Sequence, residues 1–219
     1  MLDSVRDSLG YGYSALTISR CRLVSAAQII GTIDYRYELC KEYFDRAVEF
    51  VSSTSKPGDI VLIGPRSLMD KPDSADMDKP SDVIVNGVPL TFAEAYKKSL
   101  GDMSAFAHAL APRGVAMVFI GRLPQFGKPA SQCVPEWFRM ARTSCEVPIE
   151  RSPALEILNS NVHFWDHPIA FLCGKESCSP SDGKRLLFRD DSHLSVYGSK
   201  ALAPAFMEFL KSIELPGLR

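Results

Sequence analysis

The sequence lacks several features that define large classes of protein. No apolar run approaches the roughly 20 residues that a membrane-spanning helix needs, and no Cys-x-x-Cys pair marks a structural zinc site. The 25 Lys and Arg residues nearly cancel the 26 Asp and Glu residues, so the basic surface of a nucleic-acid-binding protein is missing. The first ten residues, MLDSVRDSLG, are partly acidic and have no apolar core, unlike a signal peptide. These absences leave a globular protein for which no nucleic-acid partner is expected.

Six cysteines are present, and they favour an oxidising compartment. They fall into three pairs that are close in sequence, which suggests local disulfides, although other connectivities are allowed. The alternative is six buried thiols in a cytosolic protein. Because an exported protein needs a signal, we also expect that sequence is missing upstream of residue 1. The expected pairs are Cys21 with Cys40, Cys133 with Cys145, and Cys173 with Cys178.

Helical and strand patterns alternate along most of the chain. DYRYELCKEYFDRAVEFV (34–51) has one apolar helical face. IVLIG (60–64) and VAMVFIG (115–121) are continuous apolar runs, typical of strands that are covered on both faces. The alternation predicts one α/β domain with a parallel sheet and helices on both faces. The further predicted helices are 2–9, 91–112, 153–160 and 194–213, and the further predicted strands are 13–19 and 161–166.

The helix predicted at 91–112 has a clear N-terminal cap, and it follows an unusually long segment with little regular structure. Thr91 is placed as its N-cap, and Glu94 completes a capping box. Before it, residues 65–90 are rich in Pro, Asp, Lys and Ser and hold only VIVNG as a strand-like run. A long segment with so little regular structure is uncommon in a compact domain, so we expect a lid, an insertion or a substrate loop.

The stretch FRDDSHLSVYGSK (188–200) combines acidic residues, an imidazole and the start of a predicted helix. Asp190 and His193 are three residues apart, so a turn can present the carboxylate to one imidazole nitrogen and leave the other free, as an oriented general base requires. Ser195 is placed to cap the helix, and Gly198 would allow a close backbone approach. The alternative is an ordinary surface turn, because Asp and Ser favour turns regardless of chemistry.

The longer segment LCGKESCSPSDGKRLLFRDDSHLSVYGSK (172–200) resembles the C-terminal block of the SGNH hydrolases. It specifically resembles the SGNH domain attached to bacterial acyltransferase-3 (AT3) membrane proteins, which acylate cell-surface glycans. In that family a cysteine pair, a DG turn, a strand and D-x-x-H-L-S-x-x-G follow in this order. LTISRC, DIVLIG and VAMVFIGRLPQF also fall where the family has matching segments. The resemblance implies an SGNH/flavodoxin-like three-layer sandwich and a single domain over residues 1–219.

The resemblance makes Asp190 and His193 the acid and the base of a Ser-His-Asp triad. The nucleophile would be the serine of a GDSH motif after the first strand, but the sequence contains no G-D-S. We therefore expect the serine and the first strand to lie upstream of residue 1. The Asp-Ser pairs at 3–4 and 7–8 lie in a predicted helix, without a strand that would aim a serine at the sheet edge.

Other candidate residues are less defined. Many SGNH hydrolases use a G-x-N motif for the oxyanion, and the matching strand here ends in IGPRS. Gly64 and Arg66 are the resulting candidates for oxyanion or substrate binding, since Arg66 can supply guanidinium donors. The alternative is a surface arginine in a salt bridge. His163, Asp166 and His167 could group around a metal, but two of them flank a predicted strand end, so we expect His163 to be a packed histidine and expect no metal site.

Taken with the resemblance, these residues imply an SGNH-type acyl-ester enzyme domain of the periplasm or cell envelope. Its reaction would be the transfer of an acyl group, expected to be acetyl, to a sugar hydroxyl, or the hydrolysis of such an ester. No cofactor is implied. The expected partners are a glycan or acyl-ester substrate and an AT3 membrane domain or an N-terminal fragment. The alternative is a non-catalytic remnant or glycan-binding domain that has lost its nucleophile.

Overall fold

The computed structural model describes residues 7, 14, 27–29, 43–64, 77–85, 88–121, 123–133, 145–149, 162–165 and 167–213. Outside these residues lie the helix predicted at 153–160, the start of the helix predicted at 34–51, and nearly all of the elements predicted at 2–9 and 13–19. The chain divides into two compact units, which we describe separately. The sheet unit comprises Ala15–Phe119, Pro153–Phe164 and Glu214–Arg219, and the loop unit comprises Met1–Ser14, Ile120–Ser152 and Trp165–Ile213.

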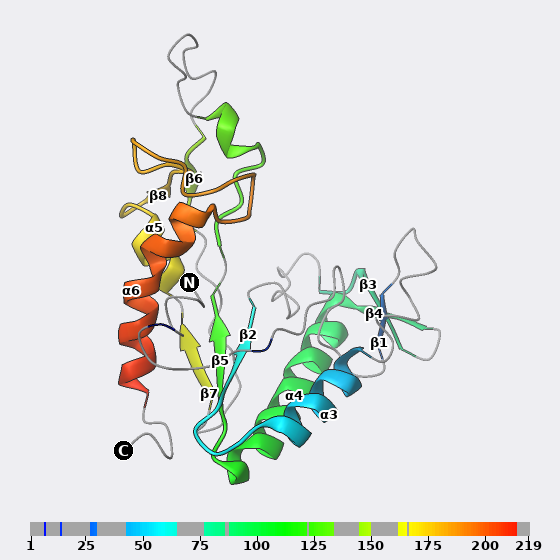
Figure 1. Cartoon of the computed structure of the whole chain (residues 1–219). Helices are drawn as coiled ribbons and strands as arrows, with labels where there is room; N and C mark the ends of the chain where they lie inside the picture. The colour runs from blue at the N-terminus through cyan, green and yellow to red at the C-terminus, as the bar shows by residue number, and fades with distance from the viewer. Residues whose placement is uncertain are drawn as a thin grey trace. The chain divides into compact units, whose positions relative to one another are not determined.

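A three-stranded parallel sheet is the main element of the sheet unit (Figure 1). Its strands are β2 (Ile60–Ile63), β5 (Ala116–Ile120) and β7 (Val162–Trp165), in the order β2-β5-β7. The strands predicted at 60–64, 115–121 and 161–166 are therefore confirmed. β5 is buried along most of its length, as expected for a strand that is covered on both faces.

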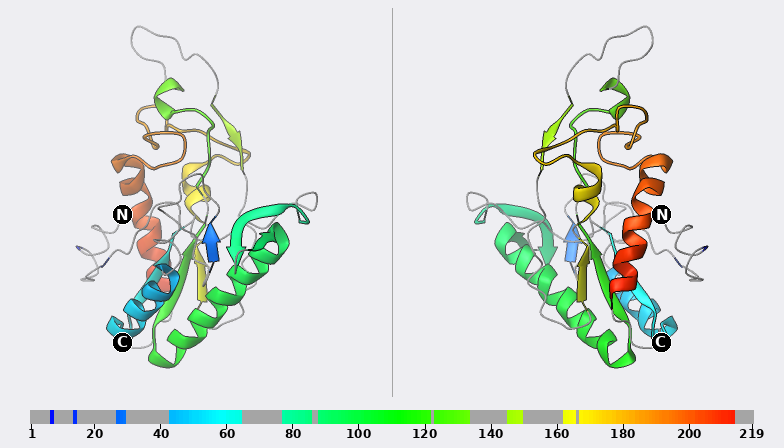
Figure 2. Two further views of the ribbon diagram at one scale, coloured as in Figure 1. Left: turned by 90° about the vertical axis from the view of Figure 1, so that its right-hand side faces the viewer. Right: turned by 90° about the vertical axis from the view of Figure 1, so that its left-hand side faces the viewer.

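Helices α3 (Tyr43–Thr54) and α4 (Phe92–Leu110) pack on this sheet (Figure 2). The predicted capping box at the start of α4 is confirmed. The hydroxyl of Thr91 accepts a hydrogen bond from the N–H of Glu94 at 3.2 Å, and the Glu94 carboxylate accepts one from the N–H of Thr91 at 2.9 Å. These bonds satisfy backbone donors that a helix start leaves unpaired. A 3₁₀ turn, η1 (Ala111–Arg113), follows the helix.

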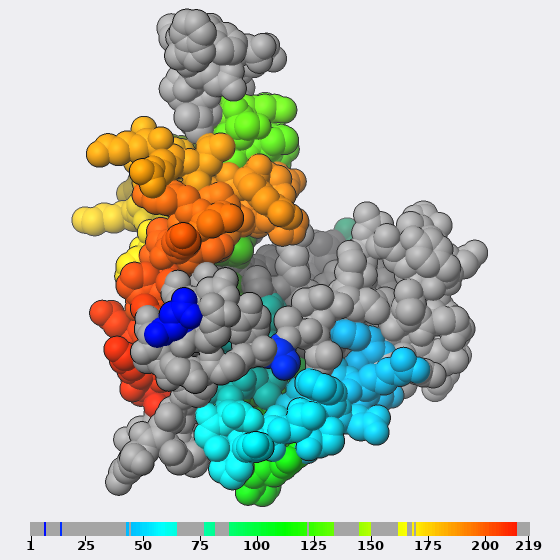
Figure 3. Space-filling view, viewed as in Figure 1, coloured from blue at the N-terminus to red at the C-terminus, as the bar shows by residue number. Residues whose placement is uncertain are grey.

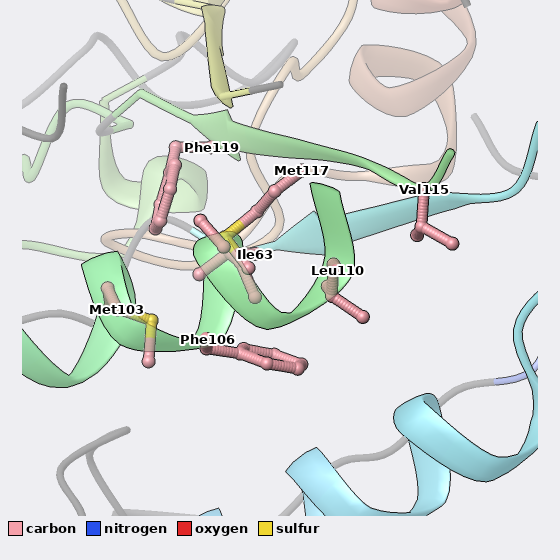
Figure 4. Packing of buried hydrophobic residues seen from close by; sticks show 8 residues of the cluster. Ile63, Met103, Phe106, Leu110, Val115, Met117 and Phe119 are labelled. Carbon is pink, nitrogen blue, oxygen red and sulfur yellow. The ribbon is translucent and has the colours of Figure 1, made fainter. Parts of the chain in front are cut away.

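The core of the sheet unit consists of apolar side chains from β2, β5 and α4 that gather between the helix and the strands (Figure 4). Side chains of α3, among them Tyr43 and Val48, pack against its edge. Burying one side chain of this size contributes about 1.5–3 kcal/mol, so this layer is a main source of the unit's stability. The labelled members are Ile63, Met103, Phe106, Leu110, Val115, Met117 and Phe119.

A small antiparallel sheet corrects the prediction for residues 65–90. Its strands are β1 (Ala27–Ile29), β3 (Pro80–Val85) and β4 (Val88–Thr91), in the order β1-β3-β4. The end of the segment is thus a hairpin, where the sequence pattern indicated only one short strand-like run. β3 is completed by β1, with Ala27 opposite Val85, and a partner so distant in sequence leaves no local signal.

The loop unit contains one long helix and several short elements. The ring of Phe206, on the long helix, packs against Trp165 with centroids 4.6 Å apart, and both side chains are buried. No helix in the described part of the chain is long and apolar enough to cross a bilayer. The elements are η2 (Ala130–Gln132), β6 (Val147–Pro148), α5 (His167–Leu172), β8 (Ser177–Cys178) and α6 (Val196–Ser212).

Two disulfides lie in the loop unit, and both join cysteines that the sequence pairs. Cys133 is bonded to Cys145, with Cα atoms 5.4 Å apart, and Cys173 is bonded to Cys178, with Cα atoms 4.1 Å apart. The third predicted pair, Cys21 with Cys40, lies outside the described residues. Disulfides persist outside the reducing cytosol, so this pair of bonds is typical of an extracytoplasmic protein.

Candidate active site

The segment between β8 and α6 is a chain of tight turns that ends in the D-x-x-H loop (residues 188–195). The backbone closes this loop at its base: the N–H of Ser195 donates to the carbonyl of Leu187 at 2.8 Å, and the N–H of Arg189 donates to the carbonyl of His193 at 2.9 Å. Phe188 and Leu194 also form an isolated β-bridge. Asp190 and His193 are thereby held within one short turn.

Asp190 and His193 are brought together as predicted. The Nδ1 atom of His193 lies 3.0 Å from Oδ1 and 2.9 Å from Oδ2 of Asp190. The carboxylate also accepts backbone hydrogen bonds from the N–H of Ser192 at 3.0 Å and the N–H of His193 at 2.7 Å. The imidazole is therefore oriented by a carboxylate that its own backbone holds in place.

These donors keep the Asp190 carboxylate ionised. The backbone N–H of Ser192 is the main group that holds its pKa well below the usual range, helped by the backbone and ring of His193 and opposed by desolvation. The guanidinium of Arg189 adds a cation, with Nε 3.3 Å from Oδ2. An ionised carboxylate at Nδ1 places the proton of neutral His193 on that nitrogen and leaves Nε2 as the basic atom.

The His193 side chain is 58% exposed, and the orange part of the chain that contains it forms part of the surface in the space-filling view (Figure 3). Within the residues that the structure describes, Nε2 has no hydrogen-bond partner. A substrate hydroxyl or a nucleophile can therefore reach this nitrogen. The arrangement can act chemically as a general base that becomes a general acid once protonated.

The start of α6 anchors the loop. The predicted N-cap is confirmed: the Ser195 hydroxyl accepts from the N–H of Gly198 at 2.9 Å and donates to the carbonyl of Leu186 at 2.6 Å. Gly198 is buried against the carbonyl of Leu187, and a Cβ atom at this position would overlap it. The predicted close approach is thus present, and it seats the loop on the first turn of the helix.

A second turn, the DG hairpin (residues 180–187), precedes the loop. Asp182 accepts from the N–H groups of Lys184 at 2.9 Å and Arg185 at 2.8 Å and from the hydroxyl of Tyr197 at 2.7 Å. The Tyr197 hydroxyl, followed by these N–H groups, lowers the pKa of Asp182 to about 2, and the same bond raises the pKa of Tyr197. Gly183 permits the turn with a φ of 85°. The sequence indicated the DG turn but not its bond to α6.

A match to a protein family identifies the domain that contains the D-x-x-H loop. A family model described as the SGNH domain fused to AT3 domains matches residues 1–208. The chain belongs to this SGNH family. Its membership makes it a domain of the acyl-ester hydrolase or transferase type and implies association with an acyltransferase-3 module. Searches of curated proteins and of solved structures found no match.

The other predicted residues of the SGNH domain are only partly described. Gly64 follows β2 in the sheet unit and is half-buried, whereas Arg66 lies outside the described residues. His163 lies on β7 and is half-buried, and desolvation lowers its pKa. Asp166 is also outside the description, and the described residues contain no group of three metal-binding side chains.

Proposed function

We propose that this SGNH domain transfers an acyl group, expected to be acetyl, to or from a hydroxyl of a cell-surface glycan by a Ser-His-Asp mechanism. The observation that carries the proposal is the contact of both Asp190 carboxylate oxygens with Nδ1 of His193, combined with family membership. This carboxylate–imidazole pair is the acid–base half of such a mechanism.

The proposed steps balance with one proton carrier. Nε2 of His193 takes the proton of a serine hydroxyl as the serine oxygen bonds to the ester carbonyl carbon. The tetrahedral intermediate breaks its bond to the leaving oxygen, which receives that proton and departs as an alcohol, leaving an acyl-serine. His193 then deprotonates the acceptor, a sugar hydroxyl for transfer or water for hydrolysis, as the acceptor oxygen bonds to the acyl carbon. The bond from that carbon to the serine oxygen then breaks, and His193 returns the proton to the serine. Asp190 stabilises the imidazolium in both halves.

The proposal places the serine upstream of residue 1, because the sequence contains no G-D-S motif. It assigns the oxyanion donors to Gly64 and Arg66, which follow a parallel strand at its carboxyl end, where α/β sheets bind ligands. No cofactor takes part in these steps. The family pattern and the sequence support these roles for the serine, Gly64 and Arg66.

We also propose the periplasm or cell envelope as the site of action. Two disulfides favour an oxidising compartment, and family membership implies an AT3 module. An AT3 membrane domain would deliver the acyl group, and a glycan hydroxyl would accept it. In this proposal the acyl donor and the acceptor of the SGNH domain therefore meet outside the cytoplasm.

The test uses the protein at the length that its natural gene encodes, assayed with an aryl acetate and with an acetylated oligosaccharide. We expect ester turnover in the wild type and a loss of at least about 1,000-fold in His193→Ala, because base and nucleophile act as a unit. His108→Ala is the matched control, since His108 is an exposed histidine on α4. It should leave turnover unchanged.

Two outcomes would count against the proposal. Equal turnover in His193→Ala and the wild type would remove His193 from the mechanism. A folded wild type that turns over no acetyl ester, but binds the oligosaccharide in a calorimetric titration, would favour a glycan-binding domain.

A further inference from the structure

A segment distant in sequence touches the D-x-x-H loop at the two acidic residues. The N–H of Phe126 donates to the carbonyl of Asp191 at 2.9 Å, and the N–H of Ala130 donates to the carbonyl of Asp190 at 3.4 Å. Both donors belong to the segment 123–133, which follows β5 and lies in the same unit as the loop. The loop is therefore held at its apex as well as at its base.

An aromatic contact joins the same two segments. The rings of Phe126 and Phe188 meet edge to face, with centroids 4.8 Å apart and planes at 72°. Phe126 is 6% exposed and Phe188 is fully buried. Phe188 opens the loop and bridges to Leu194, the residue after His193. The buried pair therefore lies directly beneath the turn that carries the acid and the base.

The exposure of the turn explains why it needs this support. His193 is 58% exposed and Asp190 is 37% exposed, so water competes for each of their hydrogen bonds. Among the residues that the structure describes, the His193 ring is bonded to Asp190 alone. The order of the pair must therefore come from the backbone beneath it, where Phe126 supplies both a hydrogen bond and buried apolar surface.

We propose that Phe126 is a positioning residue for the reaction: it holds the D-x-x-H loop in the conformation in which Asp190 orients His193. This inference rests on the proposed function, but the state of the loop can be measured without any assay of activity. The segment is itself stiffened. The N–H of Cys133 donates to the carbonyl of Ala130 at 3.0 Å, and Cys133 is disulfide-bonded to Cys145.

The first measurement is hydrogen exchange of the peptides that cover residues 186–196, in the protein at its natural length. Phe126→Ala should accelerate exchange of these amides, because it removes the ring beneath them. Phe171→Ala is the matched control, since Phe171 lies in the same unit on α5 and is 58% exposed. The control should leave exchange in the loop at the wild-type rate.

A second variant separates the ring from the hydrogen bond and guards against loss of folding. Replacing residue 126 by 3-phenyllactic acid turns its amide into an ester, so the donor to Asp191 disappears while the ring remains. We expect faster exchange in the loop, with a melting temperature close to that of the wild type. Phe126→Leu keeps the site buried and should give exchange between that of the wild type and that of Phe126→Ala.

The kinetic readout separates positioning from a general structural role. Phe126→Ala and the ester variant should lower kcat for an aryl acetate by about 10-fold to 100-fold, the scale expected when catalytic groups shift slightly. KM should change little, because the buried side chain of Phe126 offers almost no surface to a substrate. Phe126→Leu should recover part of the lost kcat, and Phe171→Ala should not change it.

Four results are decisive. Unchanged loop exchange in folded Phe126→Ala would overturn the inference, and so would faster exchange with wild-type kcat. A wild type without turnover would contradict the proposed function and with it a catalytic role for the loop, whereas the exchange data would still decide whether Phe126 orders it. Faster exchange together with a kcat effect would support both.

Discussion

The two acidic turns of the loop unit have almost the same geometry and different chemistry. In each, an aspartate accepts the backbone N–H groups of the residues two and three positions ahead: Asp182 in the DG hairpin and Asp190 in the D-x-x-H loop. Each carboxylate also meets a side chain of the α6 start or of its own turn: the hydroxyl of Tyr197 donates to Asp182, and the ring of His193 contacts Asp190, which the guanidinium of Arg189 also contacts.

The side chains of Tyr197 and His193 distinguish the two turns. Tyr197 donates its only O–H to Asp182, and a phenol is neutral near pH 7 even before this bond raises its pKa further. His193 gives one nitrogen to Asp190 and keeps a second nitrogen that can take up a proton. The same kind of turn therefore attaches the DG hairpin to α6 through Asp182 and forms a candidate acid–base pair in the D-x-x-H loop.

Exchanging the two carboxylates for amides should separate these roles most strongly. Asp190→Asn should lower kcat by as much as about 10,000-fold, because an amide can stabilise the wrong imidazole tautomer and carries no charge. Asp182→Asn should lower kcat by less than about 10-fold, since its partner Tyr197 takes no proton in the reaction. Steady-state kinetics on an acetyl ester measures both, and equal losses in the two variants would show that the turns share one structural role.

Both turns contact the first turn of α6, and a substitution of Gly198 tests how much this contact contributes to stability. Gly198→Ala should destabilise the protein by roughly 1–3 kcal/mol, because a Cβ atom would overlap the Leu187 carbonyl. Gly101→Ala is the matched control: it lies in α4 with open space around it and should stabilise by up to about 1 kcal/mol. Urea unfolding measures both, and a neutral Gly198→Ala would show that the close approach can relax.

The smallest expected effect concerns the hydrogen bond from Tyr197 to Asp182 in the DG hairpin. Tyr197→Phe removes the hydroxyl that is the main cause of the low pKa of Asp182, so that pKa should rise from about 2 toward the usual value near 3.9. A pKa that is lower in the folded state stabilises it above the unfolded pKa, and this contribution is lost as pH falls from about 4 to 2. Carboxyl NMR titration measures the shift, and an unchanged Asp182 pKa would assign its depression to the backbone donors alone.

Local signals predicted much of the fold. The capping box of Thr91 and Glu94, the N-cap at Ser195 and the three strands of the parallel sheet were all predicted from residues adjacent in sequence. The hairpin of β3 and β4 was missed although the sequence Asn-Gly between two apolar runs is a common hairpin signal. No local signal indicates that β3 also pairs with β1, more than fifty residues earlier. Propensity cannot register a partner at that distance.

In the candidate site, too, contacts between residues close in sequence were predicted and contacts between distant residues were missed. Asp190 and His193 were predicted because three residues and one turn bring them together. The support beneath them was not, since Phe126 and Phe188 are far apart in sequence and each resembles an ordinary core residue. The bond of Tyr197 to Asp182 was missed for the same reason, although the Asp-Gly pair marked the turn.

The most direct test of the account is covalent trapping of the nucleophile with a fluorophosphonate ester, in the protein at the length its natural gene encodes. The proposed mechanism predicts one phosphonyl adduct, mapped by peptide mass spectrometry to a serine upstream of residue 1. The adduct should form far more slowly in His193→Ala and at the wild-type rate in His108→Ala. An adduct that forms equally fast without His193, an adduct on a serine within residues 1–219, or no adduct in the folded wild type would contradict it.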